Sequence, residues 1–186
     1  DAHLAATTKE ENFTRIPRQE ELDLRPDADY VHICYNNTIF GTKWDYIPET
    51  GNVPLVADVH FSSEIAIAAA SVVEKVRINP GNFHKEHDKA KEQFARLVEV
   101  CKQNGTAIRI GLNHGSLGDR IMNLYGNTPL AMKEAVMEWL KMCIDNDFYN
   151  VVVSLKASNT FVMVEAYRLL ANEMQKNGVV FPMHLG

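Results

Sequence analysis

Polar and cationic side chains recur at five places in the chain, each in or directly after a short apolar run, and the last place supplies His184. Guanidinium groups offer a planar pair of donors that suits phosphate oxygens, and a lysine adds a compact positive charge. Nearby amide and hydroxyl groups supply further hydrogen-bonding partners. This combination predicts a binding site for a strongly anionic small molecule, and it assigns no catalytic residue. The candidate binding residues are Asp58, His60, Arg77, Asn79, Asn82, Arg109, Asn113, Ser116, Lys156 and Ser158.

The repetition of this pattern carries the prediction more than any single residue does. Arg77 or Arg109, taken alone, could equally be an ordinary exposed arginine. A cation or an imidazole follows each apolar run, however, and such a series favours one shared site over unrelated surface charges.

Metal chemistry has weaker support in the sequence. Cys34, Cys101 and Cys143 are widely spaced and form no CxxC pair, which is typical of small core residues rather than of a metal site. His84 and His87 lie in a charged stretch that predicts a solvated helix start, so we do not expect them to bind a metal.

The apolar runs predict the strands that must position the candidate residues. Branched residues without strict alternation are typical of strands buried on both faces, as in parallel sheets. Capping residues precede the helical stretches between them: Ser62 or Ser63, Thr128, and Ser158 or Asn159. The predicted strands are 30–35, 54–59, 75–78, 107–112, 150–155 and 179–185; the predicted helices are 62–73, 85–104, 129–146 and 159–177, with a loop around 115–118.

Alternating strands and helices predict successive right-handed βαβ units and an α/β fold with a parallel sheet. The residues leave two architectures open, a doubly wound sheet and a partial (β/α)8 TIM-type barrel. Residues 58–62 lack the glycine-rich fingerprint of dinucleotide-binding folds, and a complete barrel takes about 250 residues. We therefore expect a partial barrel domain over 53–186, preceded by an irregular N-terminal segment over 1–52. In both architectures the carboxyl ends of the strands, where the candidate residues lie, form the usual site of chemistry.

The composition narrows the possible classes of protein. The 186 residues are 46% hydrophobic and 23% charged, with a net charge of −5, as expected of a globular protein in water. A slightly acidic chain without a basic run is a poor nucleic-acid binder. No stretch is apolar enough to span a bilayer, and no signal-peptide pattern is found, so we expect a cytoplasmic location.

Five motifs occur in order between residues 53 and 186: PLVADVHF, VRINPGN, IRIGLNHGS, VSLKASN and the terminal HLG. Together they resemble the central barrel of the 4-hydroxy-3-methylbut-2-enyl diphosphate synthase family. These are iron–sulfur oxidoreductases of the methylerythritol phosphate pathway of isoprenoid biosynthesis. The resemblance implies a (β/α)8 barrel whose basic rim holds the diphosphate of a cyclic methylerythritol diphosphate. That compound is then reduced to hydroxymethylbutenyl diphosphate.

Carried over residue by residue, the resemblance assigns His60, Arg77, Arg109 and Lys156 to the diphosphate and places the other candidates around the same mouth. It also implies a [4Fe–4S] cluster in a separate C-terminal domain, and an electron donor such as ferredoxin or flavodoxin. A homodimer is a further option. None of the three cysteines lies in a cluster-ligand motif, and neither the first and last barrel strands nor the cluster domain is recognised in the sequence. We therefore expect this chain to bind no cluster and to be inactive by itself.

Residues 6–58, from ATTKEENF to PLVAD, instead resemble phosphoserine aminotransferase. This second resemblance implies pyridoxal phosphate, with Thr38 contacting the cofactor and Asp58 its pyridinium nitrogen. No motif for a Schiff-base lysine follows, and such a lysine is needed for this chemistry. Both families contain a PLVAD-like strand, so the two resemblances predict a chimeric chain joined within 54–58.

Three functions remain open on the sequence. A diphosphate-binding fragment of the reductive synthase is favoured, because its match is longer and the chemistry of the strand ends supports it independently. The alternatives are a fragment of the pyridoxal phosphate-dependent aminotransferase of serine biosynthesis, and an α/β module without activity.

Overall fold

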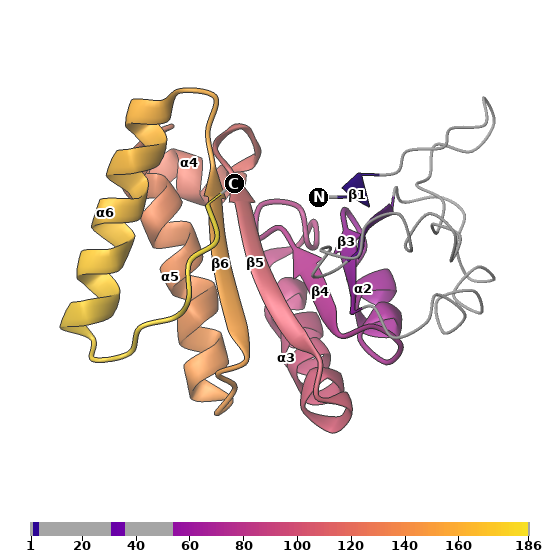
Figure 1. Cartoon of the computed structure of the whole chain (residues 1–186). Coiled ribbons are helices and arrows are strands. Elements are labelled where there is room, and N and C mark those ends of the chain that lie inside the picture. Colours follow the sequence, from indigo (N-terminus) through magenta and orange to yellow (C-terminus); the bar gives the residue numbers. More distant parts are fainter. Residues whose placement is uncertain (1, 4–30, 36–53, 186) are drawn as a thin grey trace, which may run out of the picture.

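A computed structural model describes residues 2–3, 31–35 and 54–185 of the chain, with side chains described for 54–185 (Figure 1). The strands are β1 (Ala2–His3), β2 (Val31–Tyr35), β3 (Leu55–Val59), β4 (Lys75–Ile78), β5 (Ala107–Asn113) and β6 (Val151–Lys156). The helices are α2 (Ser63–Ala69), α3 (His87–Asn104), α4 (Asp119–Tyr125), α5 (Pro129–Asp145) and α6 (Thr160–Lys176), with a 3₁₀ turn at His114–Ser116.

The described strands form one sheet in which every neighbouring pair is parallel and the order follows the chain from β1 to β6. The long helices α3, α5 and α6 pack along the outer side of this curved sheet (Figure 1). Chain-order strands with crossover helices on one side are the winding of a (β/α) barrel, whereas a doubly wound sheet reverses its order at a switch point. The predicted α/β fold with a partial barrel is therefore confirmed.

The strands of the barrel segment separate apolar from polar side chains by their alternation. One set of alternate residues packs into the core beneath the helices: Ala57, Val59, Val76, Ile78, Ile108, Ile110, Val153 and Leu155. The other set includes the register neighbours Asp58, Arg77 and Arg109. Successive side chains of a strand point to opposite faces, so these polar groups share the face turned away from the helices.

The predicted helix caps are confirmed, and the structure selects one residue where the sequence left two possible. The Ser62 hydroxyl accepts from the Ile65 N–H, Thr128 accepts from Ala131, and Asn159 accepts from Phe161 and Val162. These side chains satisfy backbone donors that a helix start leaves without internal partners. The helices consequently begin within about two residues of the predicted positions.

One predicted strand was wrong, and one short helix was missed. Residues 179–185 form no strand; Met183 makes a single parallel bridge to Val153 of β6. The Val153 N–H donates to the Pro182 carbonyl (2.9 Å), but Pro182 itself has no N–H to continue a ladder. The predicted loop around 115–118 leads into the short helix α4. Seven residues are too few to show a helical period in the sequence.

The predictions for 1–29 and 36–52, including the loop before β3, lie outside the described residues. The strand predicted at 30–35 corresponds to β2, which pairs with β3 from Val31–Leu55 to Tyr35–Val59. The sheet therefore continues across residue 53, while the division into two domains at that point stays a prediction.

Candidate anion-binding site

Arg77 is the centre of a buried group of polar side chains at the carboxyl ends of β3 and β4. Its Nη1 donates to Asp58 Oδ1 (2.7 Å) and lies 2.8 Å from His60 Nε2, and its Nη2 donates to the Gly111 carbonyl (3.0 Å). His60 Nε2 is also 3.2 Å from Asp58 Oδ1. Asp58 and Arg77 are only 8% and 7% exposed. Partners from β3 and β5, the two strands that flank β4, therefore hold the guanidinium in one orientation.

Gly111 and Ser154 shape the space beside this group, and the sequence alone did not identify either of them. A Cβ at Gly111 would lie 2.4 Å from Arg77 Nε and 3.1 Å from Ser154 Oγ, so only glycine lets the arginine pass. Ser154 Oγ accepts a hydrogen bond from Arg109 Nε (3.1 Å). A glycine inside a predicted strand is a recognised signal of close approach and could have pointed to this position.

Asn79 links the loops that follow β4 and β5. Its Nδ2 donates to Ser116 Oγ (2.8 Å), its Oδ1 accepts from the Gly81 N–H (3.0 Å), and Ser116 Oγ donates to the Asn113 carbonyl (3.1 Å). Asn79 is 1% exposed. In this structure Asn79 and Ser116 therefore bind each other and fix the two loops.

Lys156 and Ser158 are exposed at the end of β6 and in the turn that follows it. Lys156 is the register neighbour of Asn113 on β5, so it extends the polar face toward the β6 side of the sheet. The structure thus brings Asp58, His60 and Arg77 into direct contact and sets Arg109 beside them. His184, which the wrongly predicted last strand placed at a strand end, instead donates its backbone N–H to Val153.

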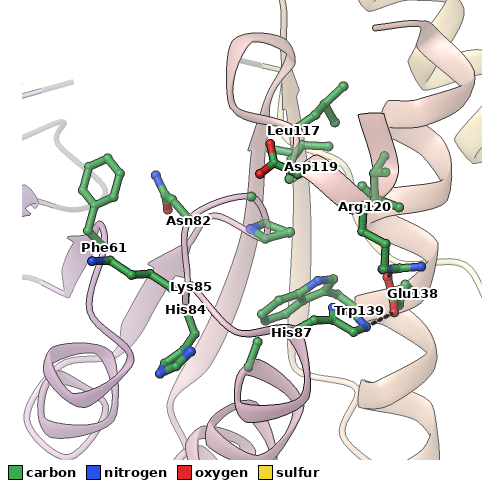
Figure 2. Close-up of a pocket in the computed structure, with 17 residues that line it drawn as sticks. Phe61, Asn82, His84, Lys85, His87, Leu117, Asp119, Arg120, Glu138 and Trp139 are labelled. Atoms are coloured by element: carbon green, nitrogen blue, oxygen red, sulfur yellow. Dashed lines mark hydrogen bonds and ion pairs between the residues drawn. The ribbon is translucent and has the colours of Figure 1, made fainter. Parts of the chain in front are cut away.

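A separate pocket of about 520 Å³ opens between the β4–α3 loop and helices α4 and α5 (Figure 2). Of the candidate residues, Asn82 alone lines it, and the Asn82 Oδ1 is buried without a hydrogen-bond partner among the described residues. At its edge Glu138 pairs with Arg120 and with His87 Nε2 (3.1 Å). His87 begins α3 with a side chain 38% exposed, as expected of a solvated helix start, and the tertiary fold adds a carboxylate partner from α5 that the sequence did not predict.

Cys101 and Cys143 lie in the core on α3 and α5, as predicted. Burial raises the pKa of each thiol to about 12, so both are protonated at neutral pH. Metal and cluster ligation uses thiolates. Within 54–185, no group of three His, Cys, Asp or Glu side chains could hold a metal ion. These two cysteines therefore do not fit an iron–sulfur cluster. The helices of the described part also include none that is long and apolar enough to cross a membrane.

Comparison with known proteins gives one consistent result. A model of the GcpE TIM-barrel domain matches residues 6–186. A protein from Bacteroides fragilis (strain YCH46) named 4-hydroxy-3-methylbut-2-en-1-yl diphosphate synthase (flavodoxin) is 50% identical, over 72% of this chain and 24% of that protein. The chloroplastic ferredoxin-type synthases of Arabidopsis thaliana and Oryza sativa are 45% and 42% identical, each over 86% of this chain and 24% of the relative. The chain thus spans about a quarter of the length of these relatives.

The same comparison corrects the second resemblance drawn from the sequence. The family model begins at residue 6 and so covers both sides of 54–58, and nothing supports phosphoserine aminotransferase or a chimeric chain. The contacts with pyridoxal phosphate that this resemblance implied for Thr38 and Asp58 are therefore unsupported as well. Asp58 pairs with Arg77 instead, and Thr38 lies outside the described residues. A short PLVAD-like strand common to two families was too little sequence to support a junction.

Proposed function

Because the chain belongs to the GcpE TIM-barrel family, we propose that it is the substrate-binding barrel part of a 4-hydroxy-3-methylbut-2-en-1-yl diphosphate synthase. In this proposal Arg77, Arg109 and Lys156 hold the diphosphate of the substrate, with His60 beside them. The observation that carries it is the pair Arg77–Arg109, neighbours in register on the face opposite the helices.

The preorganisation of the two arginines supports this role. Arg77 is fixed by Asp58 and the Gly111 carbonyl, and Arg109 by Ser154. A guanidinium that is already oriented loses little conformational freedom when an anion binds, so more of the interaction energy appears as affinity. Asp58 pairs with Arg77, and Arg109 and Lys156 add two further cationic side chains on the same face of the sheet.

The remaining candidates have supporting roles in the proposal. Asn79, Asn113 and Ser116 fix the loops after β4 and β5, which border the site. Asn82 and Ser158 stand further out on the same side of the barrel, where they would meet parts of the substrate away from the diphosphate.

Reduction of the substrate requires electrons that this barrel does not supply. The [4Fe–4S] cluster implied by the resemblance would be held elsewhere in the longer protein, since Cys101 and Cys143 do not fit it. The names of the relatives point to flavodoxin or ferredoxin as the electron donor. We therefore assign binding, and no catalytic activity of its own, to the 186-residue chain.

Calorimetric titration of inorganic diphosphate at low salt tests the proposal. Arg77→Lys and Arg109→Lys should each weaken binding by about tenfold or more, because one charge-assisted hydrogen bond contributes roughly 1.5–3 kcal/mol and a point charge cannot replace a two-pronged contact. Lys156→Gln should weaken binding less, since the lysine is exposed.

The matched control is Lys102→Gln, which removes an exposed lysine from the last turn of α3, just before the amino end of β5 and so at the opposite end of the strands from the site. It should leave the affinity unchanged. Equal affinity in the wild type and all four variants would show that the arginines are not part of an anion site.

A further inference from the structure

Phe61 has a backbone conformation that its side chain disfavours. Among the described residues, positive φ angles occur at three glycines, at Asp147 (51°) and at Phe61 (61°). Glycine enters this region without a steric penalty, and aspartate is enriched there, whereas a bulky side chain is a true outlier. The backbone of this turn would therefore favour glycine over phenylalanine.

Packing in the core does not explain why residue 61 is a phenylalanine. The residue is 62% exposed, and it is absent from the buried core cluster of the barrel segment. An extended residue here would continue the alternation of β3 and point toward the helices. The positive φ interrupts that alternation, and the ring projects from the end of β3, away from Trp139 (Figure 2).

The Phe61 ring lies beside the proposed diphosphate site. Its centroid lies 6.0 Å from that of His60, whose Nε2 contacts both Asp58 and Arg77. The ring therefore stands one residue away from the proposed diphosphate site, at the edge of the pocket lined by Asn82 and Lys85. A short carbon chain attached to a bound diphosphate could therefore meet an exposed aromatic ring here.

We propose that the Phe61 ring is a specificity-determining contact that packs against the carbon chain of an alkenyl diphosphate. This inference rests on the proposed function, because it takes the diphosphate to be held by Arg77 and Arg109. The strained backbone then has a purpose, since it turns an aromatic ring out of the core and toward the ligand.

The test compares two ligands, inorganic diphosphate and 3-methylbut-2-en-1-yl diphosphate, by calorimetry on the 186-residue chain. The wild type should bind the alkenyl ligand about tenfold more tightly, the factor expected when one or two methylene groups are buried against an aromatic face. Phe61→Gly should abolish this preference and leave the affinity for inorganic diphosphate unchanged. Phe61→Tyr keeps the ring and should keep the preference.

Folding is not expected to confound the test, because glycine adopts the observed φ without strain and should leave Tm equal or higher. Asp147→Gly is the matched control: it relaxes the other positive φ of a non-glycine residue, far along the chain after α5, and should alter neither affinity.

The outcomes separate this inference from the proposed function. If Phe61→Gly weakens the binding of both ligands equally, or if the wild type does not prefer the alkenyl ligand, the role of the ring is refuted while diphosphate binding stands. If the wild type binds neither ligand, the proposed function fails and the inference with it. A preference that persists in Phe61→Gly also overturns the role of the ring.

Discussion

Two clusters in this protein each pair a carboxylate with basic side chains, but they differ in how far they are exposed to water. The inner cluster joins Arg77 to Asp58 at 2.7 Å, with side chains only 9% and 12% exposed. The outer cluster gathers His87, Lys91 and Arg120 around Glu138, with side chains 25% to 49% exposed. The inner residues come from neighbouring strands, whereas the outer ones come from helices α3, α4 and α5.

The difference shows which charges can serve a binding site. In the inner cluster the side chains are desolvated, so each charge must be met by a partner in a fixed geometry. In the outer cluster water screens the charges, and long side chains give up rotamer freedom to form each pair, so the net contribution is small. The proposed anion site therefore uses the inner cluster, although the outer one contains more basic side chains.

The largest effect should come from breaking the inner cluster. Arg77→Ala leaves the Asp58 carboxylate buried without its main partner, which typically destabilises a protein by about 3–5 kcal/mol. Urea denaturation monitored by circular dichroism measures this loss. The double variant Arg77→Met with Asp58→Leu should recover much of it, because it removes both charges. A loss below about 1 kcal/mol for Arg77→Ala would place this pair with ordinary surface pairs.

A smaller effect should follow from crowding Arg77 without removing a charge. Gly111→Ala places a methyl group 2.4 Å from Arg77 Nε, so the guanidinium or the strand must shift. Overpacking of this kind costs about 1–3 kcal/mol, and diphosphate binding should weaken as Arg77 is displaced.

The control for this substitution is Gly115→Ala, where an added Cβ meets nothing within 4 Å. It should change neither the urea midpoint nor the affinity for diphosphate. Identical behaviour of the two variants would mean that Gly111 does not control the position of Arg77.

Neutralising the outer cluster should have a still smaller effect. Glu138→Gln removes the carboxylate that His87, Lys91 and Arg120 share, and surface ion pairs contribute about 0–1 kcal/mol. The loss should shrink further as salt is added, because exposed charges are screened. A salt-independent loss of several kcal/mol in the same urea assay would contradict the contrast between the two clusters.

The buried thiols of Cys101 and Cys143 should show no reaction in the folded protein. Cys101 and Cys143 lie on the two helices that His87 and Glu138 connect, and burial raises the pKa of both thiols to about 12. At pH 8 both remain protonated, so iodoacetamide should label them only after unfolding, and Glu138→Gln should not change this. Peptide mapping by mass spectrometry reports each cysteine separately. Rapid labelling in Glu138→Gln alone would show that the outer cluster keeps α3 and α5 together.

Much of the site was predictable because strand periodicity is a local property. Asp58, Arg77 and Arg109 each lie in or just after a run of buried residues, and parallel strands bring their carboxyl ends to one edge. The caps at Ser62 and Thr128 were predictable for a similar reason, since a capping side chain bonds to a backbone N–H three residues away. The short helix α4 escaped prediction because it carries too few residues for a periodic pattern.

The sequence by itself determined the parallel α/β fold, the strands β3 to β6 and the set of polar residues at their ends. Tertiary structure alone decided how those residues pair: Arg77 with Asp58 at 19 residues, Arg77 with Gly111 at 34 and Arg109 with Ser154 at 45. It also decided that 179–185 makes one bridge instead of a strand, and that His87 meets Glu138. Local patterns depend on neighbours a few residues apart, whereas these contacts depend on the register and curvature of the whole sheet, which no short stretch of sequence encodes.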